Sequence, residues 1–136
     1  MRVRDLAWAA GIIDGEGCIT LYKSRTNTGT AYVMKMTVTN TSMSMLQRLQ
    51  TLFACGYIGY KCRYSLRHKP CAIWEVTTKN AEQVLRLIQP YLFVKAEECQ
   101  LALLSRTLIN PHGSNKRNEN RVALDRLLLR MKELKH

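Results

Sequence analysis

Two acidic residues interleaved with glycines follow an apolar stretch near the start of the chain, in the segment Asp14-Gly-Glu-Gly17. The stretch from Leu6 to Ile13 contains only apolar and small residues, which predicts a buried helix that ends at these acids. Carboxylates at a helix C-terminus face a partial negative charge, at a cost of about 0.3–1 kcal/mol each. Because a bound cation would remove this cost, the segment is a candidate metal site. The alternative is a helix ended by a glycine cap and followed by a solvated acidic turn.

The same predicted helix carries a stripe of small residues. Spacing of i, i+3, i+4 and i+7 places its members on one helical face: Ala7, Ala10, Gly11 and Asp14. A face with so little side-chain volume allows a second backbone to approach closely.

Length and charge restrict the class of protein. The 136 residues fit one domain spanning residues 1–136, and 21 Lys and Arg against 10 Asp and Glu give a net charge of +11. Such a surplus favours a polyanionic partner, with nucleic acid as the first candidate. Membrane association is not expected, because no run approaches the roughly 18 apolar residues of a spanning helix.

Cysteine usage indicates a reducing, intracellular environment. The cysteines are odd in number, are scattered, and follow no secretory signal peptide: Cys18, Cys55, Cys62, Cys71 and Cys99. An organelle and a prokaryotic or phage-infected cytoplasm fit equally well. Cys62, His68 and Cys71 match no common zinc-ligand spacing, so zinc is not expected.

Hydrophobic periodicity predicts an α+β fold, with an antiparallel sheet of four strands covered by helices on one face. After the first helix, the expected elements are a hairpin, a helix, a second hairpin and three more helices. Their ranges are Cys18–Thr26, Val33–Thr39, Ser42–Phe53, Tyr57–Arg67, Ala72–Thr78, Ala81–Ile88, Ala96–Leu108 and, after a breaker-rich loop at 110–118, Asn120–Leu134.

Alternation along the strands separates an apolar face from a polar, cationic one. In the first hairpin Ile19, Leu21, Met34, Met36 and Val38 are expected to point inward. Two hairpins side by side can follow the major groove of DNA, which is wide enough for a β-ribbon, and we expect the polar face to contact a duplex. The candidate contacts are Thr20, Tyr22, Ser24, Thr26, Lys35, Thr37, Lys61, Arg63, Ser65 and Arg67. The faces of the fourth strand are ambiguous.

Three segments resemble the LAGLIDADG homing endonucleases, DNA-cutting enzymes usually encoded within introns or inteins. Ala9–Gly17 is similar to the nine-residue signature of that family. Gln89–Lys95 resembles its Gln-Pro-aromatic-Leu-x-x-Lys segment, and Val38–Thr41 resembles the end of its second strand. The resemblance spans roughly residues 6 to 110. It implies an αββαββα core with extra C-terminal helices.

The resemblance also implies residue roles. Glu16, with the Gly15 carbonyl, would bind Mg²⁺; Mn²⁺ is expected to substitute and Ca²⁺ to support binding only. Lys95 would place positive charge near the reacting phosphate, Asn40 would position water, and Asp14 would serve structure as much as chemistry. Some relatives have a basic residue where Ser44 stands. Either Arg48, one turn further, replaces it or the role is vacant.

The chain contains one copy of the signature, which predicts a homodimer in which two first helices cross on the small-residue stripe. Such a dimer would bring both copies of Glu16 together. By resemblance, the reaction is a staggered double-strand cut of a long, nearly palindromic site that leaves 3′ overhangs. The alternatives are an intron RNA maturase and a non-catalytic DNA-binding protein on the same fold.

Overall fold

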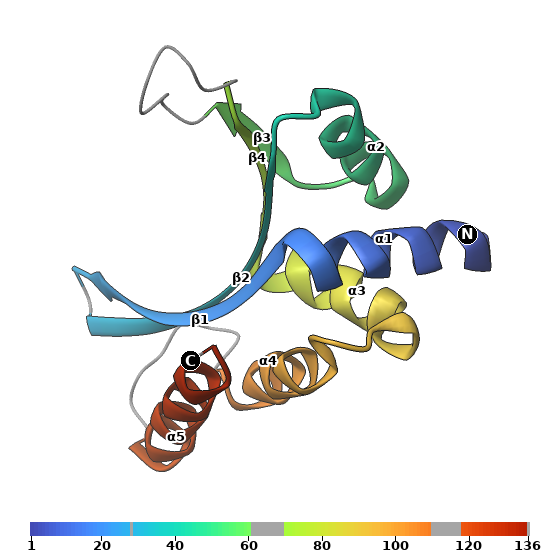
Figure 1. Cartoon of the computed structure of the whole chain (residues 1–136). Helices are drawn as coiled ribbons and strands as arrows, with labels where there is room; N and C mark the ends of the chain where they lie inside the picture. The colour runs from blue at the N-terminus through green and yellow to red at the C-terminus, as the bar shows by residue number, and fades with distance from the viewer. Residues whose placement is uncertain (28, 61–69, 110–117, 136) are drawn as a thin grey trace.

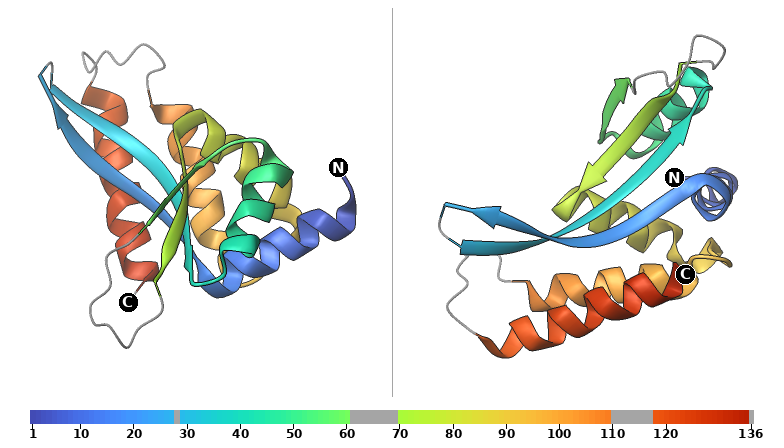
Figure 2. Two further views of the ribbon diagram at one scale, coloured as in Figure 1. Left: turned by 90° about the horizontal axis from the view of Figure 1, so that it is seen from above. Right: turned by 60° about the vertical axis from the view of Figure 1, so that its left-hand side comes forward.

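The computed structural model describes residues 1–27, 29–60, 70–109 and 118–135, arranged as a curved sheet with helices on its convex side (Figures 1 and 2). The elements are α1 (Val3–Glu16), β1 (Gly17–Thr26), β2 (Gly29–Asn40), α2 (Met43–Phe53), β3 (Tyr57–Tyr60), β4 (Ala72–Thr77), α3 (Thr78–Ile88), the 3₁₀ turn η1 (Gln89–Tyr91), α4 (Ala96–Leu108) and α5 (Asn118–Leu134).

The four strands are antiparallel neighbours in the order β1-β2-β4-β3. In Figure 1, α1, α2 and α3 lie behind the convex face, α4 and α5 lie below β1 and β2, and the concave face is left open. This arrangement confirms the predicted α+β fold. No helix in the described part of the chain is long and apolar enough to cross a membrane.

The core lies between the convex face and α1 to α4. The inward face predicted for β2 is confirmed, because the side chains of Met34, Met36 and Val38 are fully buried. Trp74 settles the orientation of β4, because its fully buried ring packs inward and its Nε1 donates to the Cys55 carbonyl oxygen at 3.1 Å. The alternate residues of β4 therefore belong to the concave face.

Several element boundaries differ from the predictions. Helix α2 begins at Met43, after Ser42 caps it by accepting a hydrogen bond from the Met45 amide. Helix α3 begins at Thr78, three residues earlier than expected. Strand β3 is described only as far as Tyr60. Alternation predicts that Ile58 and Tyr60 share one face of this strand. Ile58 packs against the core, whereas the Tyr60 side chain, at the end of the strand, is 80% exposed. Residues 61–69 and 110–117 lie outside the described residues.

Helix α5 packs against the hairpin of β1 and β2. Leu124 joins Leu21 and Tyr32 in a second apolar cluster. Next to it, the Asp125 carboxylate accepts a hydrogen bond from the Tyr32 hydroxyl and pairs with the Lys23 ammonium, both at 2.7 Å. Hydrogen bonding to Lys23, and then to Tyr32, lowers the pKa of the Asp125 carboxyl group. These contacts fix α5 beneath the hairpin.

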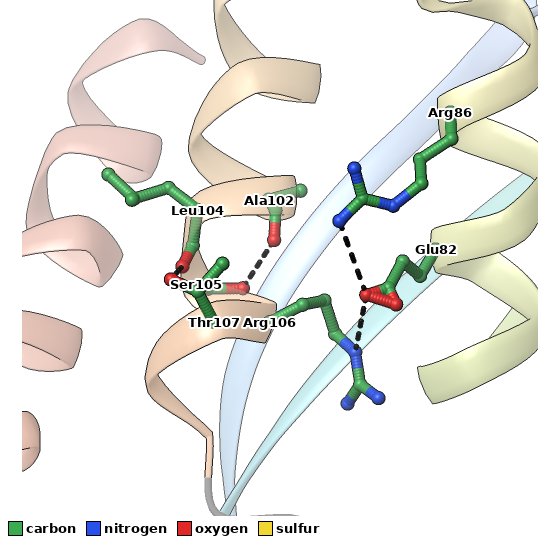
Figure 3. Close-up of polar contacts among 7 residues, drawn as sticks. All are labelled: Glu82, Arg86, Ala102, Leu104, Ser105, Arg106 and Thr107. Carbon is green, nitrogen blue, oxygen red and sulfur yellow. Dashed lines mark hydrogen bonds and ion pairs between the residues drawn. The ribbon is translucent and has the colours of Figure 1, made fainter.

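Ion pairs also connect the helices beneath the sheet. Arg86 and Arg106 both approach Glu82, at 3.6 and 3.9 Å, so one carboxylate joins α3 to α4 (Figure 3). Arg130 on α5 pairs with Glu97 on α4 at 2.8 Å. The helices therefore form a connected layer under β1 and β2.

Four cysteines are described as free thiols: Cys18, Cys55, Cys71 and Cys99. Burial raises the pKa of the Cys99 thiol to about 11, so this thiol is a core group with little thiolate character. Cys62 and His68, considered above as zinc ligands, lie outside the described residues.

Candidate active site

Helix α1 passes directly into strand β1, and this junction places Glu16 at the rim of the concave face. The Gly17 amide donates to the Ile13 carbonyl and closes the helix. A Cβ atom at Gly17 would lie 2.8 Å from the backbone of Ile13, so this close turn requires glycine. By contrast, Gly15 is exposed, and a Cβ atom added to it would meet no atom within 4 Å.

The structure brings Glu16 and Asn40, two of the predicted site residues, into contact. The Asn40 amide nitrogen donates to Glu16 Oε2. Asn40 Oδ1 accepts a hydrogen bond from the Ser42 amide at 2.8 Å, which fixes the side chain between the end of β2 and the start of α2. The Glu16 side chain itself is exposed. One carboxylate oxygen thus has an oriented amide partner, and the group remains open to a ligand.

Asp14 has a different environment, two residues earlier on the same helix. Its Oδ2 accepts from the Phe93 amide at 2.9 Å, and its Oδ1 accepts from the Lys95 amide at 3.0 Å. The Lys95 ammonium donates to the Asp14 carbonyl oxygen at 3.0 Å. Asp14 therefore fixes the segment that precedes α4, and it holds both ends of Lys95.

The C-terminal end of α1 consequently combines one open carboxylate, one oriented amide and one ammonium group. Lys95 is partly buried at the N-cap of α4, where its carbonyl accepts from the Cys99 amide at 2.9 Å. Across the described residues, no three His, Cys, Asp or Glu side chains form a group that could hold a metal ion. One chain thus offers a single accessible carboxylate at this place.

The exposed stripe on α1 differs from the predicted one at Ala10. Ala10 is fully buried in the core of its own chain, so a second helix cannot contact its side chain. The exposed small residues follow strict four-residue spacing: Ala7, Gly11 and Gly15. Beside the end of this stripe, Phe93 and Val94 are 88% and 74% exposed.

The concave face is less cationic than predicted, because Glu75 lies on it. Lys35 pairs with Glu75 at 3.3 Å and lies 5.2 Å from the centroid of the Tyr22 ring. The half-buried polar set of the first hairpin is otherwise as expected: Thr20, Tyr22, Ser24, Lys35 and Thr37. Thr26 ends β1, and Lys61, Arg63, Ser65 and Arg67 lie outside the described residues. The sequence analysis did not include Tyr57 among the candidate DNA contacts. Its side chain is 69% exposed, and its pairing with Glu75 in the strand register places it on the concave face.

Arg48 does not replace the basic residue expected near Ser44. Its guanidinium group pairs with Asp5 at 3.1 Å and stacks 5.1 Å from the centroid of the Trp8 ring. Asp5 and Glu16 are eleven residues apart on α1, roughly 16 Å at the helical rise. Arg48 is therefore committed to the other end of the helix.

Comparison with known proteins identifies the family. The family model described as LAGLIDADG endonuclease matches residues 9–101, which is more than half of the chain. The chain belongs to the LAGLIDADG endonuclease family. The matched range includes both acids of the signature, Asn40 and Lys95. A search of curated proteins gives no match.

Solved LAGLIDADG endonucleases share the fold. Homing endonuclease I-CvuI, in complex with its target and 2 mM Ca, has a TM-score of 0.81 at 20% identity over 98% of this chain and 85% of that chain. I-CvuI with 2 mM Mg and uncleaved DNA gives 0.79 at 19% identity over the same shares. The archaeal intron-encoded I-Vdi141I with DNA gives 0.80 at 12% identity, again over 98% and 85%. Meganuclease I-SmaMI gives 0.79 at 16% identity, covering 98% of this chain but 46% of that one.

Proposed function

We propose that this LAGLIDADG protein is a site-specific, metal-dependent double-strand DNA endonuclease that acts as a homodimer. The observation that carries the proposal is the end of α1, where the exposed Glu16 carboxylate is oriented by Asn40 and lies two residues from the Asp14 carbonyl that holds Lys95. Family membership supports the same reaction.

The donor chemistry around Glu16 fits a hard divalent cation. A carboxylate and the Gly15 carbonyl are oxygen ligands of the kind that Mg²⁺ prefers, and the space around Gly15 is open. When bound, the ion would lower the pKa of water and stabilise charge on the phosphodiester oxygens. We expect Mn²⁺ to substitute and Ca²⁺ to support DNA binding without cleavage. The presence of calcium or magnesium in the I-CvuI complexes is consistent with divalent ions at such sites.

The surrounding residues have distinct tasks in this proposal. The Asn40 amide orients Glu16 and adjacent solvent, since its other end is fixed by Ser42. The Lys95 ammonium, held at the Asp14 carbonyl, supplies positive charge near the phosphate as negative charge develops on it.

A homodimer would complete the site. One chain provides one accessible carboxylate, and the exposed stripe of Ala7, Gly11 and Gly15 allows a second α1 to approach closely in an isologous contact. The exposed Phe93 and Val94 would extend this contact beside the active site. The 46% coverage of I-SmaMI is consistent with two units of this size per functional assembly.

The concave sheet is the proposed DNA-binding surface. Two chains would carry 2 × (+11) = +22, and their sheets would form one long surface for a duplex. Hydroxyl groups and Tyr22 would read base edges or phosphates. Lys61, Arg63, Ser65 and Arg67, which lie outside the described residues, remain predicted contacts. We propose a staggered cut with 3′ overhangs in a long, nearly palindromic site.

Selection for cleavage from a library of randomised duplexes tests this proposal and identifies the target sequence in the same experiment. The expected result is enrichment of one nearly palindromic sequence in Mg²⁺, linearisation of a plasmid that carries it, and 3′ overhangs at both ends. Replacement of Mg²⁺ by Ca²⁺ should stop cutting but retain binding. Retention of specific DNA binding without cleavage would favour a regulator, and preference for intron RNA would favour a maturase.

A further inference from the structure

Lys135 directly follows α5, and its side chain places an ammonium group at edge strand β1, on the side of the concave face. The Lys135 ammonium lies 3.3 Å from Thr20 Oγ1 and 3.5 Å from Cys18 Sγ. Strand register places these two residues opposite Lys35 and Thr37, so all four share the concave face. Figure 1 shows the last turn of α5 close below β1, with the helix itself beneath the sheet.

Lys135 has no carboxylate partner in the part of the chain that the structure describes, whereas Lys35 on the same face pairs with Glu75. Its two acceptors, a hydroxyl and a thiol, are neutral. An anionic oxygen would add coulombic attraction to the hydrogen bond, which these uncharged acceptors do not provide. An arriving phosphate would therefore be a better partner for this ammonium than its present ones.

The position of Lys135 is set by a packed helix. Leu124 and Met131 of α5 are buried, and Asp125 is bound to Tyr32 and Lys23 of the hairpin. The ion pair between Arg130 and Glu97 fixes the same helix to α4. The ammonium is thus held near one place on β1, and only its own flexible side chain separates it from a ligand.

That place is close to the proposed cleavage site. Cys18 follows Glu16 by two residues, a span of at most about 7 Å along the chain. Each strand of a duplex has one phosphate per about 3.4 Å of helix axis. A duplex with a phosphate at Glu16 would consequently have a neighbouring phosphate within reach of Lys135.

We propose that Lys135 binds a backbone phosphate next to the scissile one and fixes the register of the DNA strand over Glu16. Lys135 is in this sense a positioning residue, and the inference rests on the proposed function. It also provides a basic group near the site from a different element, since Ser44 is neutral and Arg48 is paired with Asp5.

The test compares Lys135→Gln with Lys135→Arg and with Arg126→Gln, which removes one charge from an exposed position on the same helix. Binding to the selected duplex is measured in Ca²⁺ from 50 to 200 mM salt. One phosphate contact contributes about 0.9 to the slope of log affinity against log salt, so loss from both copies should lower the slope by about 1.8. Over this range, the affinity of the wild type should fall roughly 12-fold more than that of Lys135→Gln.

Cleavage in Mg²⁺ and the thermal midpoint of unfolding complete the comparison. We expect Lys135→Gln to cut more slowly and at neighbouring bonds while unfolding at the wild-type temperature, and Lys135→Arg to restore the salt slope. Two results would overturn the inference while leaving the proposed function intact. One is a salt slope for Lys135→Gln equal to that of the wild type. The other is a change in slope no larger than that caused by Arg126→Gln. Absence of binding and cutting by the wild type would instead refute the proposed function.

Discussion

Asp14 and Glu16 are two acids at one end of one helix, yet they serve different regions of the molecule. Both carboxylate oxygens of Asp14 accept backbone amides of the segment before α4. Glu16 is exposed at the junction of α1 and β1 and has the Asn40 amide as its partner. Two residues turn a helix by about 200°. The difference indicates that Asp14 joins the helical layer to the site, whereas Glu16 is left for an external ligand.

Replacement of Glu16 by Gln should have the largest effect on chemistry. This substitution keeps the size of the side chain but removes the charge that would hold the metal, so cleavage should fall by about 1,000-fold or more. The unfolding temperature and DNA binding in Ca²⁺ should be unchanged. Glu133→Gln, an exposed change on α5, is the matched control. Wild-type cleavage by Glu16→Gln would place the metal elsewhere.

Gly11→Leu should prevent the proposed dimer from forming while it leaves each chain folded. Gly11 is exposed and a Cβ atom added there meets no atom within 4 Å, so folding and the Asp14 contacts should persist. A second α1 could not approach, and cleavage that requires two copies of Glu16 should fall by about 100-fold or more. Sedimentation measures the change from dimer to monomer. An intact dimer with full activity would exclude this interface.

Lys95→Met should slow the reaction by about 100-fold, because it removes one preorganised charge near the phosphate. Its apolar stem is retained, and the Lys95 amide can still donate to Asp14. We therefore expect single-turnover cleavage to slow with little change in DNA affinity in Ca²⁺. A loss of affinity equal to the loss of rate would assign Lys95 to binding instead.

Asp14→Asn should mainly reduce stability. Two amides would lose a charged acceptor, at a cost of about 2 kcal/mol in the free energy of unfolding, measured in urea. Cleavage should fall less than in Lys95→Met, because the Asp14 carbonyl still accepts from the Lys95 ammonium. If Asp14→Asn instead abolished cutting without loss of stability, Asp14 would act as a ligand like Glu16.

Asn40→Ala should have the smallest effect. The Glu16 carboxylate would lose one oriented amide, which corresponds to roughly 10-fold in rate. A higher Mg²⁺ concentration should restore part of the rate, because the defect is one of ligand orientation. Titration of the single-turnover rate with Mg²⁺ measures this. No recovery at saturating metal would assign Asn40 a direct role toward solvent.

Regular patterns made much of the fold predictable. The apolar run before Asp14 indicated α1, and alternation gave the buried face of β2 at Met34 and Met36 because one face of that strand meets water. Trp74 could not be oriented in this way, since apolar residues occur on both sides of β4. Its inward position depends on the Cys55 carbonyl, a long-range partner.

The residues of the candidate site could be named from the sequence where they belong to a short motif. The family resemblance singled out both Asn40 and Glu16, and the structure adds the direct hydrogen bond between them. Ala10 was misplaced because small residues suit a core as well as an interface, and helical spacing alone does not say which side the sheet covers. The Arg48 pairing and the approach of Lys135 to β1 depend on packing between distant elements, which no local pattern encodes.

In the proposed homodimer, the exposed stripe on α1 would keep assembly separate from folding. Ala7 and Gly11 face outward, whereas Ala9, Ala10 and Ile13 on the same helix fill the core. Shape or charge could thus be changed at the outward positions without altering the interior. Complementary changes in two versions of the chain would favour heterodimers over homodimers, and each half of such a pair could be adapted to a different half of an asymmetric DNA sequence.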